Sequence, residues 1–379
     1  MHYQIIINMN HKNGYDKINF LYEDSNPHGF AYMFFDGLKD VLNRNGLLYY
    51  SYDIANKSQR LNLEELLKYP ILCFKGSWDP TFNIVKLVAG KQFIAEFNSE
   101  SLFPEKESFL LINKLSQKKN YIKLLKLFYY RKTSDFIKLL RDNIFKPVKS
   151  IDYYNMIKER KEYFDLYFIP VEEDLNSYLS FGKPCYWIPS WTHTELLDNI
   201  NLPACNKIGF IGGVTGPRIK FFAQDKNKII ECIHTIPKDN ELENIKELCK
   251  AINKYKYLVC PMGISVRTMP GKVFEYMACK RLCFCYLNDE YMFKHKLLFE
   301  DGKEIVYFKT FNELEEKYRY YLAHPQEAVQ IAQAGYEKVR KYHNADIRVQ
   351  RLVELILYHA NGGEYNNAFN DVSFYGGHS

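Results

Sequence analysis

The stretch Met269-Pro-Gly-Lys-Val-Phe-Glu-Tyr-Met-Ala-Cys279, followed by Leu282-Cys-Phe-Cys-Tyr-Leu287, predicts a loop, a helix and then a strand. Its Pro-Gly pair is typical of a loop, and the next residues are good helix formers with apolar side chains on one face. The second run is short and apolar, which favours a buried parallel strand. Glu275 lies just inside the helix, where an acid could bind a pair of ribose hydroxyls. Lys272 and the positive end of the helix together suit a diphosphate.

A glycine-rich loop precedes this stretch in Lys207-Ile-Gly-Phe-Ile-Gly-Gly-Val-Thr-Gly-Pro-Arg218, which predicts a strand, a loop and the start of a helix. Because Gly212 and Gly213 have no Cβ, the backbone N–H groups of the loop could approach a phosphate. The spacing is not the Gly-x-Gly-x-x-Gly fingerprint, and an ordinary tight turn is the alternative. Arg218 and Lys272 are candidates to neutralise a departing diphosphate. For each of them the alternative is a solvated surface cation.

Strands and helices alternate along the whole chain, which predicts an α/β fold with parallel sheets and helices on both faces. In the first half we expect strands at 3–9, 47–52, 71–74, 92–97, 164–169 and 185–188, and helices at 30–43, 112–127 and 134–143, with residues 10–19 polar and turn-rich. In the second half we expect strands at 208–211, 228–233, 257–260, 282–287 and 305–308, and helices at 217–223, 240–252, 270–278, 312–323, 326–343 and 347–359. A single large sheet is the competing arrangement.

The 379 residues are therefore expected to form two doubly wound, Rossmann-like domains that face a cleft. The first domain is predicted at 1–198 and the second at 199–345, on either side of a polar stretch. A helix at 346–360 is expected to cross back to the first domain. The Gly- and Asn-rich residues 361–379 are expected to be a disordered tail.

Three stretches resemble glycosyltransferases of the two-domain GT-B fold, and most closely the family-4-like group that includes the spore-maturation glycosyl-transferase-like proteins. The Pro-x-Lys-x-x-Glu-x-Met-Ala pattern of residues 270–278 resembles their donor-binding helix. The glycine loop with Arg218 resembles the opening of their second domain, and residues 300–335 resemble their C-terminal end. The resemblance covers residues 200–358 well and the N-terminal half in outline.

The resemblance implies transfer of a sugar from a nucleotide-diphosphate donor to an unidentified acceptor, which could be a glycan, a lipid-linked glycan or a protein. It implies that the donor is the co-substrate, that no other cofactor and no essential metal is used, and that the anomeric configuration is retained. Glu275 would then bind the donor, while Arg218 and Lys272 stabilise the leaving group. The sequence has no Asp-x-Asp triplet, which disfavours a metal-dependent one-domain transferase.

Some positions depart from the family pattern or lie outside its best-matched part. The family often has two Glu residues that lie eight positions apart. Glu275 matches the later of the two, and this chain has Arg267 at the position of the earlier one. The loop that ends at Arg267 could still line the sugar pocket through its backbone and Ser265. His28, in the loop before the first long helix, could be a base or a hydrogen-bond donor toward the cleft. A surface-loop histidine is the alternative for His28.

The charge of the chain is unevenly distributed. Residues 113–150 contain eleven Lys or Arg and two acids, a net charge of +9, whereas the whole chain carries +6. These cations alternate with apolar side chains at helical spacing. The segment could bind an anionic membrane surface, could bind nucleic acid, or could be a solvated face. Between the two partners, a membrane surface is favoured over nucleic acid.

The sequence has no apolar stretch near the roughly 18 residues that span a bilayer, and its first nine residues fit a strand better than a signal peptide. Its nine cysteines lie mostly in apolar runs without a Cys-x-x-Cys pair, which indicates free thiols. We therefore expect a cytoplasmic protein, or one that is peripheral at the inner face of the membrane. Two other functions stay open: a DNA-modifying glycosyltransferase that acts on a modified base, and a catalytically silent nucleotide- or carbohydrate-binding protein of the same fold.

Overall fold

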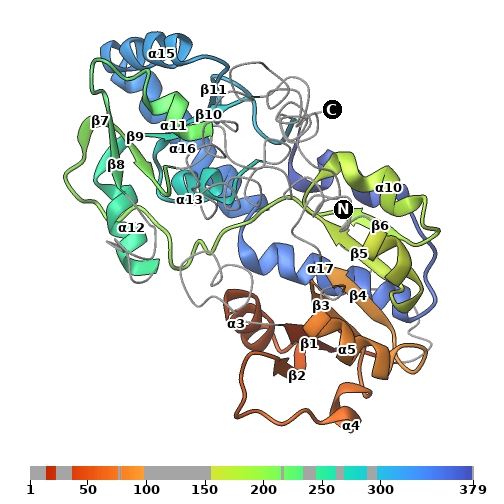
Figure 1. Cartoon of the computed structure of the whole chain (residues 1–379). Helices are drawn as coiled ribbons and strands as arrows, with labels where there is room; N and C mark the ends of the chain where they lie inside the picture. Colours follow the sequence, from red (N-terminus) through yellow and green to blue (C-terminus); the bar gives the residue numbers. More distant parts are fainter. Residues whose placement is uncertain are drawn as a thin grey trace, which may run out of the picture.

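The computed structural model of the chain describes residues 14–22, 36–75, 77, 79–97, 155–214, 217–233, 245–261, 269–287 and 297–377. Within these residues the chain forms two parallel β-sheets, each flanked by helices (Figure 1). The predicted α/β class with two doubly wound halves is confirmed, and the single large sheet is wrong. The limits predicted for the two domains stay a prediction.

The first sheet has the strand order β2-β1-β3-β4-β5-β6, and all of its pairs are parallel. The strand order reverses at β1, where Phe20 has Ser51 on one side and Leu72 on the other. The strands are β1 (Ile18–Tyr22), β2 (Leu48–Asp53), β3 (Ile71–Phe74), β4 (Ile94–Phe97), β5 (Leu166–Ile169) and β6 (Cys185–Trp187).

The second sheet has the order β11-β10-β9-β7-β8 and is also parallel. Its strands are β7 (Cys205–Ile211), β8 (Ile230–Ile233), β9 (Tyr255–Cys260), β10 (Leu282–Tyr286) and β11 (Val306–Phe308). The strand order reverses between β7 and β9. Ligands of open parallel sheets bind at the carboxyl ends of the strands beside such a reversal, and the glycine loop follows β7 at this place.

Helices cover both faces of each sheet. On the first sheet, α3 (Asp36–Arg44) and α17 (Ala345–Ala360) pack on one face, and α4 (Leu63–Leu66), α5 (Asp79–Val88) and α10 (Leu175–Leu179) pack on the other. On the second sheet, α12 (Ile245–Asn253) and α13 (Gly271–Ala278) pack on one face, α11 (Pro217–Phe222) and α15 (Phe311–Ala323) on the other, and α16 (Pro325–Tyr342) contributes to both. One apolar cluster contains side chains of both sheets, so the two halves share a core.

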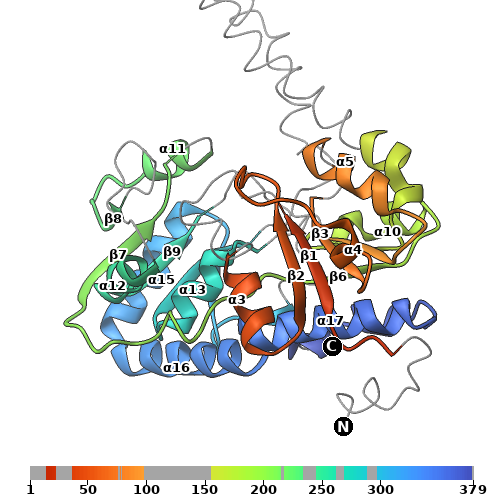
Figure 2. The same cartoon turned by 90° about the horizontal axis from the view of Figure 1, so that it is seen from below.

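The C-terminal part of the chain joins the halves. Figure 2 shows α16 under the second half and α17 under the first. Residues 361–377 then pack on β6 through the short helices η3 (Asn367–Asn370) and η4 (Val372–Tyr375). Asn370 Oδ1 accepts a hydrogen bond from Trp187 N at 2.7 Å, and Tyr375 OH donates to Trp187 O at 2.7 Å. The predicted disordered tail is therefore wrong for residues 361–377, because their aromatic side chains bury against the sheet.

The sequence patterns also missed elements of the first half. Residues 18–22 form β1, although residues 10–19 were expected to be turn-rich. The polar side chain of Asn19 is buried there, and its Nδ2 donates to Leu66 O at 2.9 Å and to Tyr69 O at 3.2 Å. Helices α4, α5 and α10 were not predicted. The strand predicted at 3–9 and the helices predicted at 112–127 and 134–143 lie outside the described residues.

Gly335 of α16 packs closely against its neighbours. A Cβ at this position would lie 2.5 Å from Glu304 O and 2.8 Å from Met277 Cε. Since a backbone carbonyl cannot turn aside, Gly335→Ala should lower the free energy of unfolding by about 1–3 kcal/mol, which outweighs a gain in helix propensity of about 1 kcal/mol. Thermal unfolding measures this, with Glu337→Ala on the exposed face of the same helix as the control. Equal melting temperatures for Gly335→Ala and wild type would contradict the packing described.

Candidate functional site

The glycine loop after β7 has a backbone that requires glycine at its first position. Gly212 has a φ of +148°, a conformation that L side chains rarely adopt. Its N–H donates to Ile233 O at 2.9 Å, which keeps the start of the loop tied to β8. A Cβ on Gly212 would also lie 2.5 Å from Lys272 Nζ. The backbone conformation therefore favours glycine, and a side chain at this position would displace the end of Lys272.

Lys272, near the start of α13, lies against the glycine loop. Its Nζ donates to Ile211 O at 2.8 Å and lies 4.9 Å from the centroid of the Phe210 ring. Burial lowers the pKa of Lys272, and the nearby Arg218 lowers it further. An anion beside Nζ would relieve both effects.

Arg218, in α11, holds the other side of the loop. Its Nη1 donates to Gly213 O at 3.0 Å, and its guanidinium lies 5.5 Å from the Phe210 ring centroid. Its Nε is buried and has no hydrogen-bond partner within the described part of the chain. Buried donors are usually satisfied, so an oxygen-bearing anion would complete this site.

The N-terminus of α13 adds further donors to the loop. Pro270 is the N-cap residue and provides no side-chain hydrogen bond to the first turn. The first N–H groups of a helix have no partner within the helix, and they favour anions. The loop, the two cations and this helix terminus together form a cationic site at the carboxyl end of β7.

Glu275 lies one turn after Lys272 on the same side of α13. Its side chain is half-buried, and among the residues that the structure describes it has no hydrogen bond or ion pair within 4 Å. Burial raises the pKa of Glu275, whereas Lys272 and His193 act in the opposite direction. The carboxylate is thus available to a ligand with hydroxyl groups.

Tyr276 fixes the position of α13, a role that the sequence analysis did not assign. The buried Tyr276 OH accepts a hydrogen bond from Ile211 N at 3.2 Å and lies 3.4 Å from Ile211 O. Lys272 and Tyr276 therefore both attach α13 to the last residue of β7. In the sequence, Tyr276 lies on the apolar face of the predicted helix, and this pattern did not indicate a polar contact.

The structure brings together five of the predicted site residues: Gly212, Gly213, Arg218, Lys272 and Glu275. The other three, His28, Ser265 and Arg267, lie outside the described residues, as does the basic segment 113–150. Their predicted roles stay predictions.

Three further features of the described residues concern metal ions, membranes and thiols. No group of three or more His, Cys, Asp or Glu that could hold a metal ion was found among them. None of the helices in this part of the chain is long and apolar enough to cross a membrane. Each of the nine cysteines is a free thiol.

Comparisons with known proteins extend this description. Residues 227–354, which include α13, match the family model described as glycosyl transferase-like. Sucrose-phosphate synthase from Thermosynechococcus elongatus has the same fold over 89% of this chain and 98% of its own, with 13% identity and a TM-score of 0.55. HepE from Anabaena, solved in complex with UDP-glucose, matches 90% of this chain and 99% of its own, with 10% identity and a TM-score of 0.51. No curated protein matches the sequence.

Proposed function

We propose that this chain, which has the GT-B fold and carries a glycosyl transferase-like region at residues 227–354, is an enzyme that transfers a sugar from a nucleotide-sugar donor to an acceptor. The prediction of a GT-B fold is confirmed across most of the chain, and the glycosyltransferase resemblance is confirmed for the matched region. The narrower resemblance to the spore-maturation group stays a prediction.

The cationic site beside β7 carries this proposal. Arg218 and Lys272 supply two positive charges, and a buried donor on Arg218 has no partner among the described residues. A diphosphate supplies oxygens and charge for both cations. One turn along α13, Glu275 can accept hydrogen bonds from the ribose hydroxyls of the same nucleotide. A nucleotide diphosphate fits this order of groups better than an isolated phosphate does.

The same groups can assist the chemistry. When the bond between the sugar and the diphosphate breaks, negative charge grows on the leaving oxygen. Cations that are already in place stabilise this charge more in the transition state than in the bound donor. Retention of configuration and independence of a metal ion belong to this proposal, and reactions run with and without a chelator test the latter.

A nucleotide screen followed by a turnover assay tests the function. UDP is the first probe because HepE was solved with UDP and with UDP-glucose, and GDP, ADP, CMP and TDP extend the screen. Thermal stabilisation by one nucleotide, together with hydrolysis of the corresponding sugar donor in the absence of acceptor, supports the proposal. Binding without hydrolysis or transfer would favour the silent binding protein. A lack of stabilisation by every nucleotide would contradict the donor site.

Lys272→Met and Arg218→Met should each lower kcat by about 10²-fold or more, with a smaller change in KM. Methionine keeps most of the apolar stem and removes the charge, so packing against Phe210 is largely retained. Steady-state kinetics with the identified donor measure the effect, and Lys220→Met, exposed on α11 beside the site, is the control. A higher KM with unchanged kcat would assign both cations to ground-state binding instead.

A further inference from the structure

The two cations of the candidate site lie over the same aromatic ring. Phe210 is the second-last residue of β7, and its side chain is fully buried. Lys272 Nζ lies 4.9 Å from the centroid of this ring, and the guanidinium carbon of Arg218 lies 5.5 Å from it. Both distances are within the limit of about 6 Å for attraction between a cation and an aromatic face. Phe210 is therefore a contact that both cations share.

The charges of these two cations are not neutralised by an acid within the described part of the chain, where neither side chain forms an ion pair. Their hydrogen bonds instead go to the backbone oxygens Ile211 O and Gly213 O. Arg218 lowers the pKa of Lys272, as expected for two like charges that repel each other. Something other than a carboxylate must offset this repulsion.

An aromatic ring is suited to this task. The face of the ring carries partial negative charge, which attracts a cation. A carboxylate in the same place would hold the cations more strongly, but it would also cancel their charge and repel a diphosphate. The ring of Phe210 attracts both cations and carries no net charge, so both positive charges remain available to an anionic ligand.

The ring is itself held in place by its surroundings. It lies 4.9 Å from the ring of Phe222, which is one turn after Arg218 in α11. The far end of the ring reaches the glycine loop, because a Cβ on Gly212 would lie 3.2 Å from Phe210 Cζ. The same side chain thus contacts α11, approaches the glycine loop and lies beneath the cation that α13 carries.

We propose that Phe210 is a positioning residue of the donor site, whose ring holds Arg218 and Lys272 in place for the charge that grows on the departing diphosphate. This inference rests on the proposed function, because it assigns the ring to the same leaving group. The sequence analysis gave Phe210 no role beyond that of a strand residue. A buried phenylalanine in a strand is usually a core residue, and its contacts with two cations distinguish this one.

A series of fluorinated phenylalanines at position 210 tests the proposal. Fluorine withdraws electron density from the ring and changes its shape little. The attraction for cations therefore falls stepwise from phenylalanine to the 4-fluoro, 3,5-difluoro and 3,4,5-trifluoro forms. We expect kcat for UDP-glucose, or for the sugar donor of the nucleotide found in the screen, to fall at each step and on the order of tenfold over the series. KM should change less, and the melting temperature should stay the same.

The same series at Phe284 is the matched control. Phe284 is a fully buried phenylalanine of β10 in the same apolar cluster, and its ring lies 6.3 Å from that of Tyr257 and 6.2 Å from that of Tyr321. Within the described ranges no cation lies over it. Fluorination at this position should leave kcat unchanged. Phe210→Leu, which removes the ring, should lower kcat at least as much as the trifluoro form does.

Repeating the series in Lys272→Met shows whether the ring acts through the cation. With one of its two cations removed, the decrease in kcat along the series should be less steep than in wild type, since coupled residues are not additive. An equally steep decrease would overturn the inference. So would a kcat that is the same for every ring at position 210, and in that case the proposed function would stand. If wild type turns over no sugar donor, the proposed function itself fails.

Discussion

Glu275→Gln should weaken donor binding by about 10²-fold or more while the protein remains folded. A hydrogen bond to a charged group contributes about 1.5–3 kcal/mol, and the carboxylate is proposed to accept bonds from two ribose hydroxyls. Calorimetry with the nucleotide found in the screen measures the loss. A Glu275→Gln variant that binds this nucleotide as wild type does would remove Glu275 from the site.

The stability of the same variant should stay equal to wild type or rise near neutral pH. Burial raises the pKa of Glu275 in the folded state, so the folded state binds this proton more tightly than the unfolded state does. The ionised carboxylate therefore lowers stability at pH values above its unfolded pKa, and glutamine removes that cost. A merely structural acid would behave in the opposite way, because its replacement would lower the melting temperature.

The pH dependence of binding provides a second measurement on wild type. If the donor needs the ionised carboxylate, its affinity should fall as the pH is lowered through the raised pKa of Glu275, which lies above that of an ordinary glutamate. Glu275→Gln should have lost this part of the profile. A profile identical in both proteins would assign the titration to another group.

Local sequence patterns predicted the elements that form the site. Helix α13 has a Pro-Gly start, good helix formers and an apolar face, and its predicted start at residue 270 differs from the observed start by one residue. The alternation of strands and helices in the second half likewise depends on short-range periodicity. For this reason Gly212, Arg218, Lys272 and Glu275 could be proposed as one site before their contacts were known.

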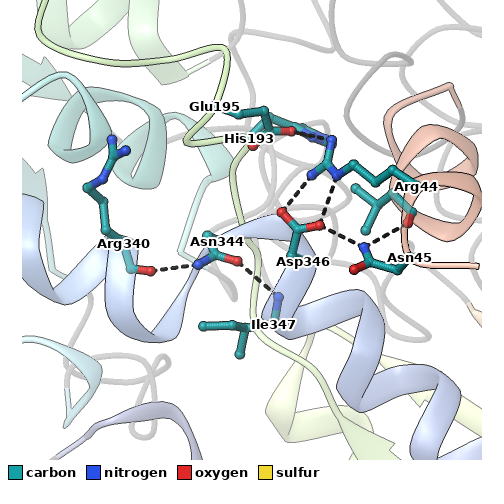
Figure 3. Close-up of polar contacts among 9 residues, drawn as sticks. Arg44, Asn45, His193, Glu195, Arg340, Asn344, Asp346 and Ile347 are labelled. Atoms are coloured by element: carbon teal, nitrogen blue, oxygen red, sulfur yellow. Dashed lines mark hydrogen bonds and ion pairs between the residues drawn. The ribbon is translucent and has the colours of Figure 1, made fainter.

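Contacts between distant segments could not be predicted in this way. Glu195 contacts both His193 and Arg44, which lies far away in the sequence, and no local spacing connects them (Figure 3). The C-terminal residues are rich in Gly and Asn, a composition typical of disorder, yet Tyr375 and Asn370 bond to β6. In both cases the structure depends on contacts with residues in a distant segment, and the local sequence does not identify those residues.

Strand β1 of the first half shows the same limit. The run Ile18-Asn-Phe-Leu-Tyr22 has a polar residue inside an apolar stretch, and it follows a polar segment. Its Asn19 is compatible with the centre of a sheet because carbonyl groups at the end of α4 accept its amide hydrogens. A buried polar residue is stabilised by such partners, which are supplied by a later part of the chain.

Gly212→Ala should lower kcat/KM by about 10²-fold or more, since small displacements in a site can have effects of this size. The backbone conformation at φ +148° is one that glycine adopts and alanine does not, with a strain of about 1–3 kcal/mol. The new Cβ would also stand 2.5 Å from Lys272 Nζ. The flexible end of Lys272 would move away, and its bond to Ile211 O would be lost.

Gly302→Ala separates the strain from the effect on the site. Gly302 also has a positive φ, +74°, but a Cβ there would meet no atom within 4 Å. Both variants should lose stability from the backbone, whereas only Gly212→Ala should lose turnover beyond what its melting temperature explains. Adding Lys272→Met to Gly212→Ala should then reduce kcat/KM little further, because the displaced ammonium already fails to reach the leaving group. If Lys272→Met lowers kcat/KM as much in Gly212→Ala as it does in wild type, Lys272 still acts in Gly212→Ala. The effect of Gly212→Ala would then come from the strained backbone alone.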